Sequence, residues 1–256
     1  MKVRLANYSN AEDPIITLYK AYRVCYAKGE HCDIKLPTKE DNTLDFSVMT
    51  NFIVHKMAMN HTSPLEHISF TFEINGVSRA LTHQLVRHRT GKYSQQSQRY
   101  VKFGQFEYVI PPSINNDPEL KARYIEEMER DQQAYDFFVD KLITNQIISC
   151  PLHVVDPTNH EVFKKLNPRL YSKFEKLAIE DARYVFPNSS CSNITCTMDL
   201  HNFRHFYALR NCVHAQWEIR ELAKLMGQVI REVIPFATHR AMNCGKTCFD
   251  CKTPIE

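Results

Sequence analysis

The hydrophobic pattern of the N-terminal part predicts a strand followed by two helices. Residues 1–7 alternate in polarity, as a short strand does. Asp13-Pro14 predicts the start of a helix that runs to about Ala27, because Asp caps free N–H groups and Pro suits the first helical turn. Apolar residues recur at helical spacing in Leu44–Met59, which predicts a second helix there.

A strand and a helix follow one another in the next segment. Apolar and polar side chains alternate over Ile68–Ile74, which is the clearest strand pattern in the chain. From Ser78 the apolar spacing becomes helical again. We therefore expect a helix that begins near Ser78 and delivers the basic triplet Arg87-His88-Arg89 at its C-terminal end.

The second half of the chain is predicted to be mostly helical. Asp117-Pro118-Glu119 indicates the start of a long helix, whose apolar face is expected to hold Leu120, Tyr124, Met128, Tyr135, Phe138 and Leu142. Further elements are a helix at Pro168–Phe186, a strand at Ser192–Met198, and helices at Leu200–Leu209 and Glu218–Val233. Many helices with two or three strands predict an α+β fold, helix-rich and with a small, mostly antiparallel sheet.

No repeat, flexible linker or long charge block marks a domain boundary. We expect residues 1–235 to form one domain and residues 236–256 to form a cysteine-containing C-terminal tail. The chain has 256 residues, 43% hydrophobic and 24% charged, which is typical of soluble globular proteins and excludes disordered and collagen-like ones. The N-terminus lacks a signal-peptide pattern and no stretch reaches about 18 apolar residues, so we expect a cytoplasmic protein that does not enter a membrane.

Positive charge is concentrated in one segment, although the net charge of the chain is only +3. No acidic residue lies between Glu73 and Glu107, whereas six basic residues do: Arg79, Arg87, Arg89, Lys92, Arg99 and Lys102. Guanidinium groups form charge-assisted, bidentate hydrogen bonds with phosphate oxygens, so this segment predicts an anionic ligand. Two alternatives remain open: a solvated basic loop, or a single-stranded nucleic-acid-binding module in which Tyr93, Tyr100 and Phe103 stack on bases.

The motifs in and around this segment resemble those of a known enzyme family. Arg87-His88-Arg89, followed after seven residues by Ser97, resembles the defining motif of the flavin-dependent thymidylate synthases, and the similarity continues through Gln98-Arg99-Tyr100. Three further blocks resemble family motifs in the family's order: His61-Thr62-Ser63-Pro64-Leu65-Glu66-His67, Ala182-Arg183-Tyr184-Val185-Phe186-Pro187 and the segment Leu209–Arg220. The resemblance covers roughly residues 45–235.

The resemblance implies a reaction, its cofactor and its partners. The chain would methylate dUMP to dTMP, with 5,10-methylenetetrahydrofolate as the carbon donor and with FAD carrying a hydride from NADPH. A flavin supplies the hydride that side chains cannot provide, while the protein binds, orients and stabilises charge. The resemblance also implies a homotetramer with shared active sites, and small molecules rather than nucleic acid as the partners.

The same resemblance places the dUMP contacts on Gln84, Arg87, Gln95, Ser97, Gln98, Arg99, Arg183 and Arg210. Arg99 and Ser97 carry groups that suit the 5′-phosphate. Arg210 is expected to be the main catalytic group, because a guanidinium at the uracil edge stabilises charge that develops at N3 and O4. Without the surrounding block, a structural salt bridge between Arg210 and Glu218 would be the simpler interpretation.

The FAD contacts implied by the resemblance fall on Ser63, Arg87, His88, Arg89, Gln95, Asp199, His201 and His205. His61 is expected beside the flavin or the folate as a second catalytic residue, whereas His67 is interpreted as structural. Asp199 stands where the family usually has Asn, which exchanges a hydrogen-bond donor for an acceptor. Gln95 stands where some members have Glu.

None of the nine cysteines is assigned to catalysis, and no metal site is predicted. An odd number of cysteines without an export signal indicates reduced thiols rather than a disulfide framework. Cys244, Cys248 and Cys251, with His239 upstream, are either zinc ligands or reduced thiols of a flexible tail. The alternative functions are therefore a zinc-organised protein and the basic nucleic-acid-binding module without flavin.

Overall fold

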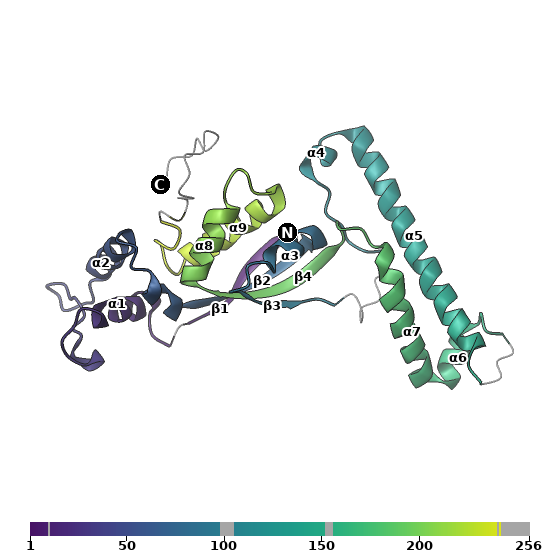
Figure 1. Ribbon diagram of the computed structural model, residues 1–256, viewed down its shortest axis with the longest axis horizontal. Helices are drawn as coiled ribbons and strands as arrows, with labels where there is room; N and C mark the ends of the chain where they lie inside the picture. Colours follow the sequence, from purple (N-terminus) through teal and green to yellow (C-terminus); the bar gives the residue numbers. More distant parts are fainter. Residues whose placement is uncertain (10, 98–104, 152–155, 240, 242–256) are drawn as a thin grey trace. The chain divides into compact units, whose positions relative to one another are not determined.

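The computed structural model describes residues 1–9, 11–97, 105–151, 156–239 and 241. Within them, the elements are many helices and one small sheet, which confirms the α+β class (Figure 1). The sheet has four strands in the order β1-β2-β4-β3. The strands are β1 (Lys2–Tyr8), β2 (Ser69–Ser78), β3 (Lys92–Gln95) and β4 (Cys191–Asp199). Three of them lie where the sequence predicts strands, and β3 was missed.

The alternation predicted for Ile68–Ile74 is borne out in the sheet. Strand β2 pairs antiparallel with β1, and Val3 lies opposite Ile74. Phe70, Phe72 and Ile74 are buried, whereas the polar residues between them are partly exposed. Burial of alternate side chains therefore fixes which face of β2 is covered.

Two of the helices begin at the N-terminal signals that the sequence predicts. Their bounds are α1 (Pro14–Val24), α2 (Phe46–Ala58), α3 (Arg79–Leu85), α4 (Pro112–Asn115), α5 (Pro118–Ile148), α6 (His160–Leu166), α7 (Pro168–Ala182), α8 (Leu200–Arg210) and α9 (Trp217–Arg231), with 3-10 turns η1 (His31–Asp33), η2 (Ser63–His67) and η3 (Arg183–Val185). Asp13 caps α1 by accepting a 2.8 Å hydrogen bond from the Ile15 N–H, and Asp117 caps α5 in the same way. Helix α1 ends three residues earlier than expected.

The chain divides into two compact units made of interleaved segments. The first unit contains Met1–Asn75, Leu81–Ser94 and the described part of Asn193–Glu256, and the second contains Gly76–Ala80 and Gln95–Ser192. In the first unit, α1 packs on α2, η2 packs on α1 and α8, and α9 packs on β1 and α8. The predicted limits, one domain at 1–235 and a tail at 236–256, stay a prediction.

The beginning of the expected tail is packed into the first unit. Phe236 and Ala237 are buried. Arg204 of α8 donates hydrogen bonds of 2.7 and 2.8 Å to the carbonyl groups of Ala237 and His239. This partly buried guanidinium therefore anchors the chain that follows α9. Residues 242–256, with the three C-terminal cysteines, lie outside the described residues.

In the second unit, α5 and α7 lie side by side and enclose an apolar core (Figure 1). The predicted apolar face of α5 was wrong at two positions, because Leu120 and Phe138 are 51% and 43% exposed. The buried stripe runs through Tyr135, Val139 and Ile143 instead. The buried residues recur every four positions, slightly more than the 3.6 residues of one helical turn, so the stripe winds slowly around α5. Phe138 lies outside this stripe.

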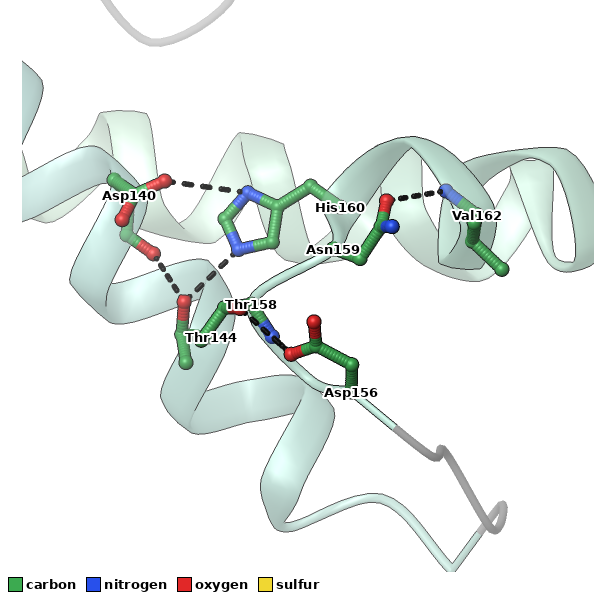
Figure 2. A network of polar contacts seen from close by, with 7 residues as sticks. All are labelled: Asp140, Thr144, Asp156, Thr158, Asn159, His160 and Val162. Carbon is green, nitrogen blue, oxygen red and sulfur yellow. Dashed lines mark hydrogen bonds and ion pairs between the residues drawn. The ribbon is translucent and has the colours of Figure 1, made fainter.

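A polar network connects α5 to the start of α6, which the sequence analysis did not predict (Figure 2). The Thr144 hydroxyl donates to the Asp140 carbonyl at 3.0 Å and lies 2.9 Å from Nε2 of His160. Nδ1 of His160 lies 3.4 Å from the Asp140 carboxylate. Asn159 caps α6 by accepting from the Val162 N–H at 3.3 Å. Side-chain hydrogen bonds thus compensate for the short length of α6.

Candidate active site

One residue separates the basic triplet from α3, which ends at Leu85. The His88 N–H donates to the Leu85 carbonyl at 3.1 Å, and the Gly91 N–H donates to the His88 carbonyl at 3.0 Å, so the chain turns tightly here. Arg87 and Arg89 are exposed. Within the described residues, neither guanidinium has a hydrogen-bond or ion-pair partner. Both are therefore available to an anionic ligand.

The half-buried His88 is hydrogen-bonded to Arg210. Nε of Arg210 donates to Nε2 of His88 at 2.9 Å, and the ring of Phe206 meets the imidazole edge-on with 5.0 Å between centroids. Burial, together with the nearby Arg210 and His205, lowers the pKa of His88 from 6.5 to about 4. The imidazole is thus neutral near pH 7, and its accepting Nε2 leaves the proton on Nδ1.

Arg210, the expected main catalytic group, is the last residue of α8. Besides its bond to His88, its Nη1 makes a long 3.5 Å contact with the Gln84 side-chain oxygen. Burial lowers the pKa of Arg210, but a guanidinium remains charged near pH 7. Three predicted site residues from two sequence blocks, Gln84, His88 and Arg210, are therefore brought together in the first unit.

Tyr93 supports this cluster in a role that its sequence context does not predict. Its hydroxyl donates to the His88 carbonyl at 2.8 Å, and burial raises the pKa of the phenol. A Cβ atom on Gly91 would collide with the Tyr93 hydroxyl, so glycine permits the close approach. The sequence suggested base stacking for Tyr93, whereas the structure shows it closing the turn that holds His88.

The N-terminal end of α8 carries three of the expected FAD residues. Asp199 is the N-cap of α8, because its carboxylate accepts from the Asn202 N–H at 2.8 Å and from the Asn202 side-chain amide. Asp and Asn both cap helices well, which accounts physically for Asp at this position. His201 is partly exposed and His205 is exposed. The Asp199 carboxylate is thus engaged with its own helix.

His61 and Ser63 border η2, which packs on α1 and α8. Pro64 and Leu65 are buried and hold this turn in place, while Ser63 is exposed. Nδ1 of His61 lies 3.0 Å from the Tyr26 hydroxyl. The fold therefore places the block that begins at His61 against the helix that ends at Arg210.

The other described site residues belong to the second unit. The Gln95 amide donates to the Ser192 hydroxyl at 3.1 Å, and Ser97 is partly exposed. Nε of Arg183 donates to the Glu180 carbonyl at 3.1 Å. Burial, and next the charge of Arg183, lowers the pKa of Arg79, so two guanidiniums share this region. Gln98 and Arg99 lie outside the described residues.

The described cysteines are Cys25, Cys32, Cys150, Cys191, Cys196 and Cys212, and all are free thiols. Burial raises the pKa of Cys196 to about 12, which keeps it protonated. In the described part of the chain, no group of three or more potential ligand side chains could hold a metal ion. Cys244, Cys248 and Cys251 lie outside that part, so the zinc alternative stays a prediction.

Comparison with known proteins gives both sequence and fold relatives. The family model described as thymidylate synthase complementing protein matches residues 4–236. The flavin-dependent thymidylate synthase of Clostridium tetani is 39% identical over 96% of this chain and 94% of its own length. The enzyme of the same name from Nitratidesulfovibrio vulgaris is 37% identical over 95% of this chain and 89% of its own length.

Two solved structures share the fold. Thymidylate synthase X from Helicobacter pylori, determined with FAD and dUMP, has a TM-score of 0.55 and 18% identity over 94% of this chain and 99% of its own. A UMP/dUMP methylase, PolB from Streptomyces cacaoi, bound with 5-Br dUMP, has a TM-score of 0.64 and 22% identity over 94% of each chain. Among the described residues, no helix is long and apolar enough to cross a membrane. The sequence matches over nearly the whole chain show that this protein belongs to the flavin-dependent thymidylate synthase family.

Proposed function

We propose that this enzyme methylates dUMP to dTMP, with 5,10-methylenetetrahydrofolate as the carbon donor and NADPH as the final reductant. The observation that carries the proposal is the Arg210–His88 pair. The neutral imidazole of His88 accepts a 2.9 Å hydrogen bond from the guanidinium of Arg210, the candidate catalytic group. The family and the names of its relatives support the same reaction.

Arg210 acts in this proposal as a fixed positive charge beside the uracil ring. His88 accepts from Nε and Gln84 lies near Nη1, which orients the guanidinium plane, and in this proposal the edge that carries Nη2 faces the substrate. Adding a carbon at C5 moves electron density toward the ring nitrogen and carbonyl oxygens. A preorganised cation stabilises that density in the transition state without transferring a proton.

The residues around the triplet fit FAD, which carries an anionic pyrophosphate. Arg87 and Arg89 are exposed and, among the described residues, unpaired. The imidazoles of His201 and His205 add hydrogen-bonding groups from α8. When bound, the flavin supplies the hydride. The role of these side chains is to hold the cofactor and keep it oriented.

The 5′-phosphate of dUMP is assigned to the guanidinium-rich part of the second unit. Arg183, supported by Arg79, supplies charge there, and Ser97 supplies a hydroxyl. Gln95, Gln98 and Arg99 complete the proposed substrate contacts from the sequence motif. Guanidiniums bind phosphate with two parallel hydrogen bonds, which favours the nucleotide over the free base.

We also propose a homotetramer with active sites shared between subunits. Large apolar side chains are exposed on the second unit, including Phe137 at 63%, Ile148 at 62% and Leu166 at 74%. Contiguous exposed apolar surface marks sites that bind another protein, and we propose that these side chains contribute to such a surface. Sedimentation at micromolar protein concentration tests the assembly. The cytoplasmic location stays a prediction.

The test of the proposed function combines a spectrum with an assay. The purified protein with added FAD should show flavin absorbance that NADPH bleaches and that dUMP perturbs, and it should convert dUMP to dTMP only with 5,10-methylenetetrahydrofolate. Absence of flavin binding and of dTMP would overturn the proposal. Salt-sensitive binding of single-stranded nucleic acid by a flavin-free protein would instead support the basic module.

A further inference from the structure

The backbone at the end of α2 determines where the His61 side chain begins. Asn60 has a φ angle of 60°, in the left-handed region. Its N–H donates to the Met57 carbonyl at 3.0 Å, and the His61 N–H donates to the Lys56 carbonyl at 3.2 Å. This pair of bonds is the Schellman motif, which ends helices at a residue such as Gly or Asn. The hydrogen bonds of this motif therefore fix the backbone of His61 relative to α2.

Two tyrosines, Tyr22 of α1 and Tyr26 just beyond its end, surround the His61 ring. The Tyr26 hydroxyl lies 3.0 Å from Nδ1 of His61. The ring of Tyr22 meets the imidazole edge-on, with 5.3 Å between centroids and an interplanar angle of 81°. The buried Tyr22 hydroxyl has no hydrogen-bond partner among the described residues. The phenol oxygen bonded to the imidazole is therefore that of Tyr26.

The charge of Lys56 favours one direction for this hydrogen bond. Its ammonium nitrogen lies 3.9 Å from the centroid of the Tyr26 ring. A cation over a phenol ring withdraws electron density, which strengthens O–H as a donor and weakens the oxygen as an acceptor. The unprotonated nitrogen of an imidazole is a good acceptor. Tyr26 therefore donates to Nδ1, and the neutral ring carries its proton on Nε2.

We propose that Tyr26, with Lys56, is a positioning residue for His61: it holds the imidazole as the Nε2–H tautomer and presents that N–H as a hydrogen-bond donor to the bound ligand. The inference rests on the proposed role of His61 beside flavin or folate. Both ligands have heteroaromatic rings with carbonyl oxygens, which accept such a bond. Fixing one tautomer removes a rearrangement that would otherwise precede binding.

The tautomer is tested directly by magic-angle-spinning ¹⁵N NMR of histidine-labelled protein, measured both without ligand and with added FAD. A His61→Gln variant identifies the His61 signals. In the wild type we expect one neutral form, protonated on Nε2. Tyr26→Phe keeps the ring beneath Lys56 and removes the hydroxyl, so we expect a mixture of tautomers and a roughly 10-fold lower kcat at saturating FAD.

Two matched variants separate positioning from packing. Tyr22→Phe also removes a phenol hydroxyl beside His61, but one that is not bonded to the imidazole. This variant should leave both the tautomer and kcat unchanged. Lys56→Met keeps a long, unbranched side chain but removes the charge over the Tyr26 ring, and it should shift the tautomer ratio part of the way.

A wild-type His61 protonated on Nδ1, or an unaltered tautomer in Tyr26→Phe, would overturn the proposal. Equal losses of kcat in Tyr22→Phe and Tyr26→Phe would also overturn it, because they would indicate packing alone. The proposed function fails separately, through absent FAD binding and absent dTMP formation, since the nitrogen signals are measured without turnover.

Discussion

Nε of Arg210 donates a 2.9 Å hydrogen bond to Nε2 of His88, and this bond joins the end of α8 to the turn that follows α3. The contact requires a neutral imidazole, because a protonated ring has no acceptor. Burial and the neighbouring cation lower the pKa of His88 and so favour the form that can accept. The orientation of Arg210 thus depends on the protonation state of His88.

Replacing Arg210 should remove catalysis while sparing the flavin. For Arg210→Ala we expect a roughly 10²–10³-fold lower kcat for dTMP formation, the usual loss when a charge-stabilising group is removed. Arg210→Lys should also be impaired, since an ammonium group cannot reproduce the donor at Nε. Flavin absorbance of each purified variant serves as the control. Near wild-type turnover in Arg210→Ala would contradict the assignment.

The lowered pKa of His88 predicts a loss of stability in mild acid. The native ring takes up a proton only near pH 4, whereas the unfolded chain takes it up near pH 6.5. The unfolded state therefore binds more protons between these values, and the free energy of unfolding falls as the pH falls from about 6.5 to 4. Because the ring is half-exposed and solvent screens its interactions, we expect the free energy of unfolding to fall by about 1–2 kcal/mol over this pH range.

Urea midpoints measured from pH 4 to pH 7 check this effect. His88→Gln keeps an oxygen acceptor in reach of Arg210 but does not titrate, so its midpoint should vary less with pH than that of the wild type. His83→Gln, at an exposed position of the preceding helix, is the control and should follow the wild type. Equal pH dependence of all three proteins would argue against the buried neutral histidine.

The capping role of Asp199 predicts different effects for two substitutions. Asp199→Ala should lower the free energy of unfolding by about 1 kcal/mol, because the Asn202 N–H loses its acceptor. Asp199→Asn should cost less, about 0.5 kcal/mol, since Asn is an equally good cap but removes the favourable charge at the helix N-terminus and one acceptor for the Asn202 side-chain amide. Urea unfolding of both variants measures the difference. A larger loss for Asn than for Ala would disprove the cap.

The network between α5 and α6 predicts a local effect on the second unit (Figure 2). Thr144→Val keeps the side-chain shape but leaves Nε2 of His160 without its partner, so we expect a loss of about 1–2 kcal/mol. Thr144→Ser retains the hydroxyl and is the matched control. Hydrogen exchange of the α6 amide groups should accelerate in the Val variant only. Equal exchange in Val and Ser variants would show that the hydroxyl does not hold α6.

The guanidinium of Arg89, which has no partner among the described residues, predicts salt-sensitive flavin binding. Arg89→Ala should weaken FAD binding by roughly 10-fold at low ionic strength and reduce the effect of added salt, because the missing charge no longer attracts the pyrophosphate. Arg123→Ala, on the surface of α5 and paired with Glu126 and Glu127, is the control. Fluorescence titration of FAD at two salt concentrations measures both effects. Unchanged salt dependence in Arg89→Ala would exclude this contact.

Local spacing along the chain was enough to place most elements. The alternation in β2 and the caps Asp13 and Asp117 appear in the structure where the sequence predicts them. These features depend on residues within one or two turns, so a short window contains their cause. Strand β3 and helix α6 were missed because both are short and their stability comes from pairing and side-chain bonds with distant residues.

The residue types of the candidate site, and the order of its motifs, are properties of the sequence alone. The distances and contacts between these residues depend on the tertiary structure. His88 and Arg210 are 122 residues apart, and Tyr26 and His61 are 35 apart, and nothing near either residue identifies its partner. Packing of α8 beside the turn after α3, and of α1 beside η2, creates these contacts, and the burial that comes with packing lowers the pKa of His88. Chemistry that depends on desolvation and on distances of about 3 Å arises only when distant segments pack together.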